Sequence, residues 1–393
     1  MPEDRNNRQL PAGWRWVQLG DVCEVVAGQS PPGETYRKTP EGLPFFQGKA
    51  DFGLRHPIAR SWCVAPTKIA LPGDILISVR APVGPTNVAD AECCIGRGLA
   101  AIRPQADADH EFILASLRLL EKQLAALGSG STFGAIRITD LESLQIPLPL
   151  LNEQKRIAAI LNEQMAAVER ARAAAEARLE AAKALPAAFL REVFSDFHDT
   201  HFPRKKLCEI LTLRKEIIHP RDEPSGPATF VGLEHVESTT GKRISSVPIE
   251  MSQLTGRKPR FHRGDIVYGY LRPYLNKVWI AEFDGLCSVD QYVYSVSTTQ
   301  ADIQYVAWFM RSSAFLTRAP VENAPAWLPR IRIEELAETE INLPALQEQH
   351  RIAKGLNEQM ASANRARKVI EEELDTINRL PAALLRRAFS GEL

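Results

Sequence analysis

Apolar residues recur every seven positions along two long stretches, residues 152–189 and 347–384. Residues 152–185 contain no glycine or proline and are rich in alanine, glutamate, arginine and leucine, which are strong helix formers. One register holds Leu161, Val168, Ala175, Ala182 and Phe189, and it recurs as Leu356, Ala363, Ile370, Ile377 and Leu384. A second register holds Ile157, Ala171 and Leu185, and it recurs as Ile352, Ala366 and Leu380. Heptad spacing with many small alanines predicts two long helices that pack closely side by side.

Prolines mark the ends of both predicted helices. Pro149 and Pro344 disfavour helix just before each stretch begins. Pro186 and Pro381 are expected to break or kink each helix before a short C-terminal segment. A helix over residues 153–185 would be about 50 Å long at 1.5 Å per residue.

The two stretches belong to an internal repeat. The sequence LNEQM occurs at residues 161–165 and again at 356–360, a shift of 195 positions. With this shift and no gap, 28 of 50 positions from Ile146 onward are identical to their counterparts. Because the period is far longer than that of a solenoid repeat, the sequence indicates a duplicated domain.

The regions before each helix have mixed character and match each other poorly. Residues 73–80 read as a turn followed by a buried strand, and residues 264–272 repeat that design. Residues 108–127 and 303–316 are predicted to form amphipathic helices, and residues 198–206 a polar linker. The predicted order is therefore α/β domain, long helix, α/β domain, long helix. Because the two helices match well and the regions before them match poorly, the sequence favours a common scaffold that carries two modules with different recognition tasks.

Length and composition suit a globular protein of about two to four domains. No apolar run is long enough to span a bilayer, and the six cysteines form no C-x-x-C pair. We therefore expect a cytoplasmic protein with free thiols and no membrane contact.

The formal net charge is zero, but the charge is unevenly distributed. Residues 242–277 contain eight basic and two acidic residues, and residues 49–103 contain seven basic and four acidic residues. Binding to a polyanion depends on the local potential, so the sequence permits nucleic-acid binding despite its neutral total. Ordinary solvated surfaces are the alternative interpretation of these stretches.

Three stretches resemble catalytic or metal-binding motifs, but each lacks residues that the motif requires. The stretch GLPFFQGKA (residues 42–50) has five residues rather than four between its glycines, and alanine replaces the Ser or Thr of a P-loop. SPPG (residues 30–33) lacks the aromatic residue with which amino-methyltransferases hold a flipped base. His198 and His201 have metal-like spacing but no further ligand pair nearby, which favours ordinary surface histidines. We expect neither catalysis nor a metal site on this chain.

Several stretches carry a family resemblance. They are residues 10–31 (LPAGWRWVQLGDVCEVVAGQSP), 73–104, 130–161, 263–293 and the closing LPAALLRRAFSGEL. In order and spacing the chain resembles the DNA-specificity subunit of type I restriction-modification systems. One departure is that GSGSTFG (residues 128–134) aligns with NAPAWLP (residues 323–329), so the glycine-rich loop is not shared by the two copies.

The resemblance implies an α+β architecture of four parts. Residues 1–150 and 198–344 would be target-recognition domains, and residues 151–197 and 345–393 would be spacer-helix regions that pack as an antiparallel coiled coil with a pseudo-twofold repeat. Each recognition domain would read one half of a bipartite site in double-stranded DNA, and the helices would hold the two domains a fixed distance apart. Two methyltransferase subunits would dock on the helices, and restriction or translocase subunits would associate through them. The chain itself would be non-catalytic and would act in bacterial or archaeal host defence, with S-adenosylmethionine, ATP and Mg²⁺ on the partner subunits.

Candidate DNA contacts were chosen because Lys, Arg, Ser and Thr bind phosphates, while Arg and aromatic residues read or stack on bases. In the first module they are Lys49, Arg55, Arg60, Arg80, Arg97, Ser129, Ser131 and Thr132. In the second module they are Arg257, Lys258, Arg260, Tyr268, Tyr270, Arg272, Tyr274, Lys277 and Trp327. Solvated surface charges or core aromatics are the alternative interpretation of each residue.

Two other functions compete with DNA recognition. One is a protein-interaction scaffold whose two α/β modules bind protein, and salt-dependent binding to DNA would distinguish it. The other is a self-sufficient methyltransferase or a fused restriction enzyme, which the missing cofactor motifs oppose.

Overall fold

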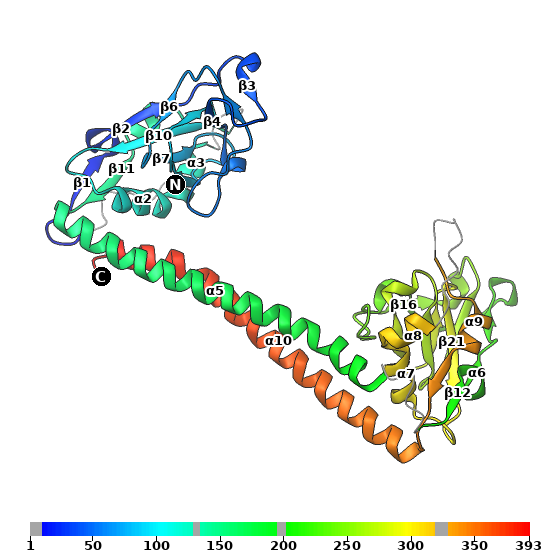
Figure 1. The fold of residues 1–393 in the computed structure, drawn as a ribbon. Coiled ribbons are helices and arrows are strands. Elements are labelled where there is room, and N and C mark those ends of the chain that lie inside the picture. Colours follow the sequence, from blue (N-terminus) through cyan, green and yellow to red (C-terminus); the bar gives the residue numbers. More distant parts are fainter. Residues whose placement is uncertain (1–9, 129–133, 195–201, 319–328) are drawn as a thin grey trace. The chain divides into compact units, whose positions relative to one another are not determined.

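The computed structural model describes residues 10–128, 134–194, 202–318 and 329–393. The chain forms two compact units, one from residues 1–176 and 372–393 and the other from residues 177–371 (Figure 1). We call them unit 1 and unit 2. Each combines sheets with helices, so the fold is α+β, as the sequence predicted. Over the described residues, no helix combines the length and apolar character needed to cross a membrane.

Unit 1 contains three sheets. Strands β1 (Arg15–Gln18) and β11 (Gln145–Leu148) pair. A four-stranded sheet has the order β2 (Cys23–Ala27), β10 (Leu99–Pro104), β7 (Ile75–Ser78) and β8 (Thr86–Val88). A five-stranded sheet has the order β3 (Tyr36–Arg37), β5 (Trp62–Cys63), β4 (Leu43–Phe46), β9 (Cys93–Ile95) and β6 (Ile69–Ala70). The helices of this head are α1 (Leu19–Val22), α2 (His110–Leu119), α3 (Glu121–Gly128) and α4 (Ile138–Glu142).

Unit 2 repeats this plan. Strands β12 (Arg204–Lys206) and β22 (Glu340–Asn342) pair. The four-stranded sheet is β13 (Leu211–Leu213), β21 (Gln291–Val296), β18 (Ile266–Gly269) and β19 (Val278–Ile280). The five-stranded sheet is β14 (Ile217–Ile218), β17 (Lys258–Phe261), β20 (Gly285–Cys287), β15 (Pro227–Val231) and β16 (Val247–Glu250). The helices are α6 (Leu207–Ile210), α7 (Ile303–Arg311), α8 (Ser313–Arg318) and α9 (Ile333–Glu338).

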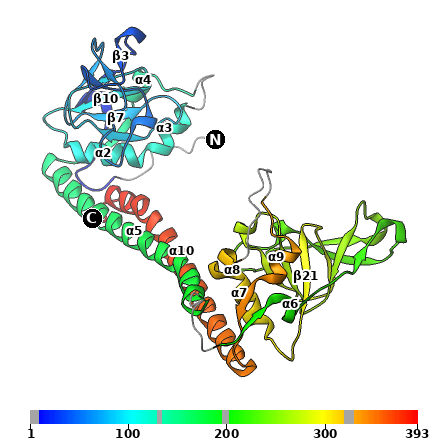
Figure 2. The ribbon, with the colours of Figure 1, turned by 45° about the vertical axis from the view of Figure 1, so that its right-hand side comes forward.

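The central strand of each four-stranded sheet is buried on both faces. In β7, Ile75 and Ile77 face the cluster that includes Phe112 of α2, whereas Leu76 faces a second cluster against the other sheet. Helix α2 lies beside β7 and β10 in Figure 2. This double burial explains the apolar run of Ile75, Leu76 and Ile77, and it confirms the buried strand that was predicted after the turn at residue 73.

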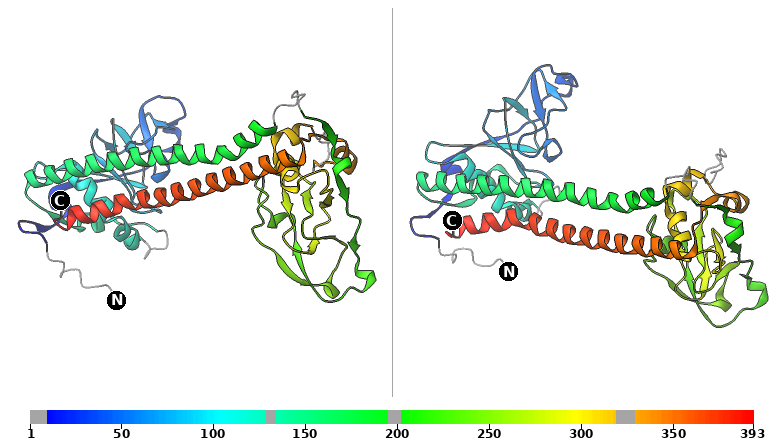
Figure 3. Two further views of the ribbon diagram at one scale, coloured as in Figure 1. Left: turned by 90° about the horizontal axis from the view of Figure 1, so that it is seen from below. Right: turned by 60° about the horizontal axis from the view of Figure 1, so that its bottom comes forward.

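The two long helices are α5 (Leu151–Phe194) and α10 (Leu346–Phe389), each of 44 residues and therefore about 66 Å long at 1.5 Å per residue. They pack antiparallel within each unit. In unit 1 the start of α5 lies beside the end of α10 (Figure 3), and Arg172 Nε donates to Asn378 Oδ1 at 3.1 Å. In unit 2 the end of α5 packs on the start of α10, because Leu190 and Leu356 share one buried cluster.

Only one of the two predicted heptad registers forms the buried seam. Leu161, Val168 and Ala175 are buried, as are their counterparts in α10. The second register is buried at the start of α5, where Ile157 is 1% exposed, but it was wrong further along, because Ala171 and Ala366 are exposed and Leu185 and Leu380 are 38% and 39% exposed. The residues one position after the second register face the seam instead. They are at least half-buried: Ala158, Met165, Arg172 and Leu179 in α5, and Ala353, Met360, Arg367 and Leu374 in α10.

The structure corrects three boundaries. Neither helix breaks at its proline, since α5 continues through Pro186 and α10 through Pro381. Each proline removes one backbone hydrogen bond, and the packing of the buried residues around it keeps the helix continuous. The end of the predicted linker is strand β12, which pairs with β22.

Each predicted amphipathic helix is divided in two. Helices α2 and α3 are separated at Leu120, and α7 and α8 at Ser312. Ser312 has extended backbone, and its hydroxyl accepts from Phe315 N at 3.3 Å, so it begins α8 as a cap.

A buried glutamine ties each head to its long helix. Gln154 Oε1 accepts from Asp109 N at 2.7 Å, and its Nε2 donates to Pro149 O and Asp107 O at 2.9 and 3.1 Å. Gln349, 195 residues later, makes the same bonds to Asp302 N, Pro344 O and Gln300 O at 2.8, 2.8 and 3.1 Å. Asp109 and Asp302 are the N-caps of α2 and α7, so one side chain fixes the start of a head helix against the start of a long helix.

Candidate nucleic-acid interface

In each unit, the chain directly after the inner strand of the four-stranded sheet, β7 or β18, bridges a loop at the equivalent place in the repeat. Residue Arg80 after β7 bridges Ala135, and Leu271 after β18 bridges Arg330. Ala135 and Arg330 are 195 positions apart, so the repeat places equivalent backbone at the end of both strands. We call these two places edge 1, in unit 1, and edge 2, in unit 2.

Edge 1 is built from loops that approach closely at glycines. Val79 N donates to Gly98 O at 3.0 Å, which joins the loop after β7 to the loop between β9 and β10. A Cβ atom on Gly98 would lie 2.1 Å from Gln47 O, and one on Gly28 would lie 2.2 Å from Gly96 O. Only glycine permits these contacts, and they gather three loops into one surface.

Three predicted basic residues lie on these loops. They are Lys49, Arg80 and Arg97, and all three are exposed. Arg97 N is held by Ser30 Oγ at 3.3 Å, which leaves the arginine side chain on the outside of its loop. Edge 1 therefore offers three basic side chains on adjoining loops.

Edge 2 carries arginines and stacked tyrosines. Arg272 is exposed, its backbone lies in the left-handed region with φ 53°, and its N donates to Pro329 O at 2.8 Å. Tyr274 is 61% exposed on the next turn, η7 (Pro273–Leu275). Tyr270 stacks on Tyr292 with ring centroids 4.2 Å apart and 19° between the planes.

The charges around Tyr270 place two more arginines at edge 2. Burial and Asp290 raise the pKa of Tyr270, whereas Arg330 and Arg257 lower it, so both guanidinium groups are close enough to act on its hydroxyl. Arg257 and Arg330 are exposed. The sequence analysis missed Arg330 and Tyr292. Arg330 could have been found because it is the repeat equivalent of Ala135, and both residues directly follow the loop whose sequence differs between the two copies.

Other predicted residues are held elsewhere by partners. Arg55 pairs with Glu111 of α2, and His110 and Arg55 lower the pKa of Glu111 to about 2. The Arg55 backbone contacts Val88, which pairs with the first residue of β7 and so lies away from edge 1. Arg60 is exposed on the loop before β5.

Three basic residues of unit 2 are also engaged. Arg260 Nη1 pairs with Glu216 at 2.9 Å, Lys258 Nζ lies 5.1 Å from the centre of the Phe230 ring, and Lys277 Nζ donates to Leu233 O at 2.6 Å. These three charged groups, which were predicted to bind DNA, are therefore engaged in contacts within unit 2.

Tyr268 was a wrong choice. Its side chain is fully buried in the core of unit 2, where it packs edge-on against Phe315 with ring centroids 5.7 Å apart. It lies on the central strand β18, whose residues are buried on both faces of the sheet. Ser129, Ser131, Thr132 and Trp327 lie outside the described residues.

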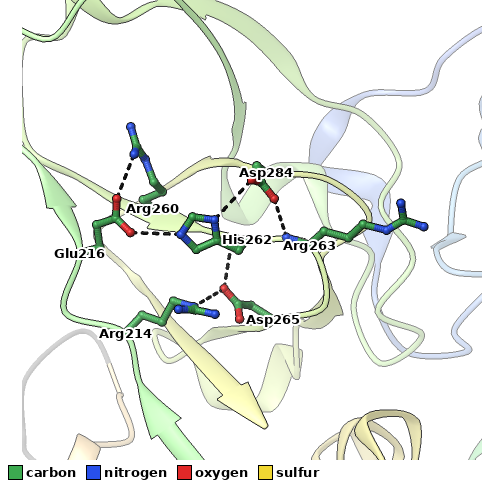
Figure 4. Close-up of polar contacts among 7 residues, drawn as sticks. All are labelled: Arg214, Glu216, Arg260, His262, Arg263, Asp265 and Asp284. Carbon is green, nitrogen blue, oxygen red and sulfur yellow. Dashed lines mark hydrogen bonds and ion pairs between the residues drawn. The ribbon is translucent and has the colours of Figure 1, made fainter. Parts of the chain in front are cut away.

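The end of β18 away from edge 2 is fastened by a charged network (Figure 4). His262 bridges two carboxylates, with Nε2 3.1 Å from Glu216 Oε2 and Nδ1 3.3 Å from Asp284 Oδ2. These contacts raise the pKa of His262. Asp265, directly before β18, accepts from His262 N at 2.7 Å and pairs with Arg214 at 2.6 Å.

Unit 1 fastens its central strand in a related way. Asp74 precedes β7, accepts from Leu71 N at 2.8 Å and pairs with Arg103 at 2.7 Å. The two buried aspartates thus have equivalent places but recruit their arginines from different strands. The network in unit 2 is therefore structural support for the strand that ends at edge 2. Within the described residues, no group of three or more His, Cys, Asp or Glu side chains could hold a metal ion.

The exposed groups at the two edges suit recognition of a nucleic acid. Guanidinium and ammonium groups donate to phosphates and to guanine, and exposed tyrosines offer both a ring and a hydroxyl. The two edges share the same backbone bridge and differ in their side chains.

Comparisons with known proteins find similarity to type I restriction-modification specificity subunits. The family model for the type I restriction modification DNA specificity domain matches residues 11–175. A Methanocaldococcus jannaschii protein named as the MjaX specificity subunit of a type I restriction enzyme is 45% identical over 153 residues, which are 38% of this chain and 36% of that protein. The EcoDI specificity subunit of Escherichia coli is 26% identical over 418 residues, covering 98% of this chain and 90% of that one.

Among solved structures, the HsdS subunit of Thermoanaerobacter tengcongensis is 54% identical over 42% of each chain, with a TM-score of 0.38. The matched regions of the MjaX and HsdS chains are thus less than half of each of those proteins. The similarity to EcoDI, in contrast, extends over both repeats of this chain. Residues 11–175 therefore match the type I restriction modification DNA specificity domain, and over nearly its whole length the chain is similar to the specificity subunit of a type I restriction enzyme.

Proposed function

We propose that this chain is the DNA-recognition subunit of a type I restriction-modification complex, and that each unit reads one half of a bipartite duplex site. The observation that carries the proposal is the recurrence of a basic edge at the equivalent strand end of both units. The backbone of this edge is the same twice, but its side chains differ. Two different half-sites require this combination.

The side chains at the edges fit direct reading of base pairs. Arginine binds guanine O6 and N7 through two hydrogen bonds in the major groove, and one such contact contributes about 1–3 kcal/mol of discrimination. Lysine and the remaining arginines would neutralise phosphates, which makes binding strongly dependent on salt. We assign Arg80, Arg97, Arg257, Arg272 and Arg330 to these contacts, with Lys49 and Tyr274 beside them.

We propose that the long helices dock two methyltransferase subunits. Several exposed residues are identical in the two copies although they take no part in the seam, for example Glu163 with Glu358 and Arg170 with Arg365. The surface ion pair of Arg156 with Glu153 also recurs as Arg351 with Glu348. A surface that is repeated without a packing reason supports two copies of one partner.

The chain would be non-catalytic in this complex. S-adenosylmethionine, ATP and Mg²⁺ would be bound by the methyltransferase and restriction subunits, and restriction subunits would attach through the methyltransferases. A subunit that acts on chromosomal DNA works in the cytoplasm of a bacterium or archaeon, which is the location we propose.

Selection of bound duplexes from a random pool tests the proposal. The purified full chain, with its methyltransferase partners, is expected to enrich duplexes with two short fixed blocks separated by a random gap. Binding should weaken steeply as salt is raised from 50 to about 200 mM. Failure to bind any duplex at low salt would favour the protein-interaction scaffold instead.

A further inference from the structure

One arginine occurs at the same helix position in both units, partly buried in unit 1 and buried in unit 2. Arg118 of α2 and Arg311 of α7 each lie nine residues after the N-cap aspartate of their helix, Asp109 and Asp302. Each guanidinium points toward the edge strand of the four-stranded sheet. Arg118 Nε donates to Thr86 Oγ1 of β8 at 3.4 Å, and Arg311 Nε donates to Val278 O of β19 at 3.0 Å.

The charge of Arg118 has acidic neighbours. Burial and Arg55 lower the pKa of Arg118, but Glu111 and Glu121 oppose this effect. Glu111 belongs to the same helix and Glu121 to α3, so unit 1 supplies its own counter-charge.

The charge of Arg311 has no such neighbour. Its residue is 8% exposed, and its guanidinium carbon lies 4.6 Å from the centre of the Trp308 ring. Burial alone lowers the pKa of Arg311 to about 10. Among the described residues, no neighbouring charge contributes to this pKa shift, and the hydrogen bond that the guanidinium makes runs from Nε to Val278 O. A buried cation without an anion is costly, so native proteins rarely keep one without a function.

Arg311 lines an open cavity of about 440 Å³. Gln304, two turns earlier on the same face of α7, lines the cavity with it, as does Arg263. Glu282 also lies at the cavity, but it is engaged by Arg243 at 2.9 Å. The lining residues therefore include two arginines and a glutamine, all of which can donate hydrogen bonds to an anion.

Gly241 keeps the space beside the guanidinium clear. Its φ is 65°, and a Cβ atom there would lie 1.9 Å from Val278 O and 2.6 Å from Arg311 Nη2. Any other residue would displace Arg311 from the strand. With Nε bound to Val278, the two Nη groups remain to bind two oxygens of one anion.

We propose that the cavity beside Arg311 in unit 2 binds a small oxyanion such as phosphate, which supplies the counter-charge that unit 1 provides from its own carboxylates. The site is separate from both edges and does not depend on the DNA-recognition function proposed above. Phosphate and carboxylate share the required geometry of two oxygens, so both serve as probes.

The test uses the full chain labelled with 5-fluorotryptophan, which gives six fluorine resonances. Trp308 is assigned by its loss in Trp308→Phe. Inorganic phosphate and acetate are titrated separately at constant ionic strength, with chloride as the balancing anion. The Trp308 resonance is expected to shift saturably with phosphate or acetate, while Trp62 of unit 1 remains unchanged. The anion that half-saturates at the lower concentration identifies the preferred oxyanion chemistry.

Three variants locate the site. Arg311→Met should weaken the anion effect at least about tenfold, because hydrogen bonds to a charged group are lost. The matched change Arg118→Met should leave it intact. Gln304→Glu places a carboxylate inside the cavity and should abolish the effect without removing Arg311, so it remains informative if Arg311→Met fails to fold. A Trp308 resonance that responds to neither anion, or an equal response in Gln304→Glu, would overturn the proposal.

Discussion

At the scale of single residues, the interface depends on side chains held outside loops whose backbones are fixed. Arg272 illustrates this arrangement, because its backbone bonds to Pro329 while its side chain is exposed. Arg260 illustrates the opposite case, since an ion pair to Glu216 occupies its charge. Exposure and free charge, rather than charge in the sequence, therefore distinguish the residues of the two edges.

Arg272→Ala tests the assignment of edge 2. The change should weaken binding to the cognate duplex by about 1–3 kcal/mol, the contribution of one base-directed contact. Lys354→Ala, which removes one exposed charge from α10 in the same unit, should change affinity much less. Fluorescence anisotropy with a labelled duplex measures both, and equal losses would refute the assignment.

His262 makes unit 2 sensitive to pH. Glu216 and Asp284 raise its pKa in the folded state, so the stabilisation is fully present below the ordinary histidine pKa of about 6.5 and is lost as pH rises through the higher folded value. His262→Gln should therefore lower Tm more at pH 6 than at pH 8.5. The double variant Glu216→Gln with Asp284→Asn removes both partners and should abolish this difference. A His262→Gln effect that is equal at both pH values would contradict the role of the network.

The residues that lie at the two edges were harder to predict from the sequence than the helices and strands. Lys49, Arg80, Arg97, Arg257, Arg272 and Tyr274 were chosen from the sequence and lie at the two edges. Tyr268 was predicted because aromatic residues can read or stack on bases, but both faces of β18 are covered. Arg330 was missed because its place at the edge depends on a bridge to Leu271, 59 positions earlier in the chain. Contacts of this range leave no local signal.

At the scale of elements, the repeated glutamine joins each head to a long helix. Gln154 satisfies one backbone donor and two backbone acceptors. Gln154→Leu has similar size but leaves these groups unpaired in a buried place. We expect the free energy of unfolding of unit 1 to fall by at least about 2 kcal/mol, since each unsatisfied buried group costs about 1–3 kcal/mol. Asn152→Ala, at an exposed position in the same turn, is the control for denaturant titrations. Equal stability of the two variants would show that the glutamine contributes nothing.

The elements themselves were largely predictable. Helix-forming composition and the first heptad register located α5 and α10, and apolar runs located β7 and β18. The second register failed because alanine at positions 171 and 366 is compatible with either a seam or a surface. Its small side chain buries little area in either case, so the apolar pattern did not determine the helix rotation. The division at Ser312 depends on a side-chain cap, which an apolar pattern cannot reveal.

At the scale of the whole molecule, the chain is one scaffold built twice. The order of the four-stranded sheet recurs, and so does the parallel pair, with β4 beside β9 in unit 1 and β15 beside β20 in unit 2. The outermost strand of the five-stranded sheet differs, because β3 pairs with β5 in unit 1 and β14 with β17 in unit 2. The sequence repeat predicted the duplicated helices, but the heads have diverged too far for their common topology to be read from residue identity.

The long helices are proposed to set the gap between the half-sites. Four residues inserted in α5 after Ala174, with four inserted in the partner helix after Glu373, add about 6 Å of helix and rotate the rest of each helix by only about 40°. The fixed bases should be unchanged and the gap should lengthen by up to about two base pairs at 3.4 Å each. Two residues inserted at each place rotate the seam by about 200° and should prevent assembly with the methyltransferases. A four-residue variant with new fixed bases and the original gap would contradict the proposal.

The most direct test of the central claim is the methylation pattern of DNA in cells that carry this chain with the methyltransferase subunits proposed as its partners. Single-molecule sequencing should find one bipartite motif, with two fixed half-sites separated by a gap of constant length and random sequence. Deletion of the chain should remove that methylation, and Arg272→Ala should relax or abolish recognition of one half-site while the other remains. A contiguous motif, or methylation that persists without the chain, would contradict the account.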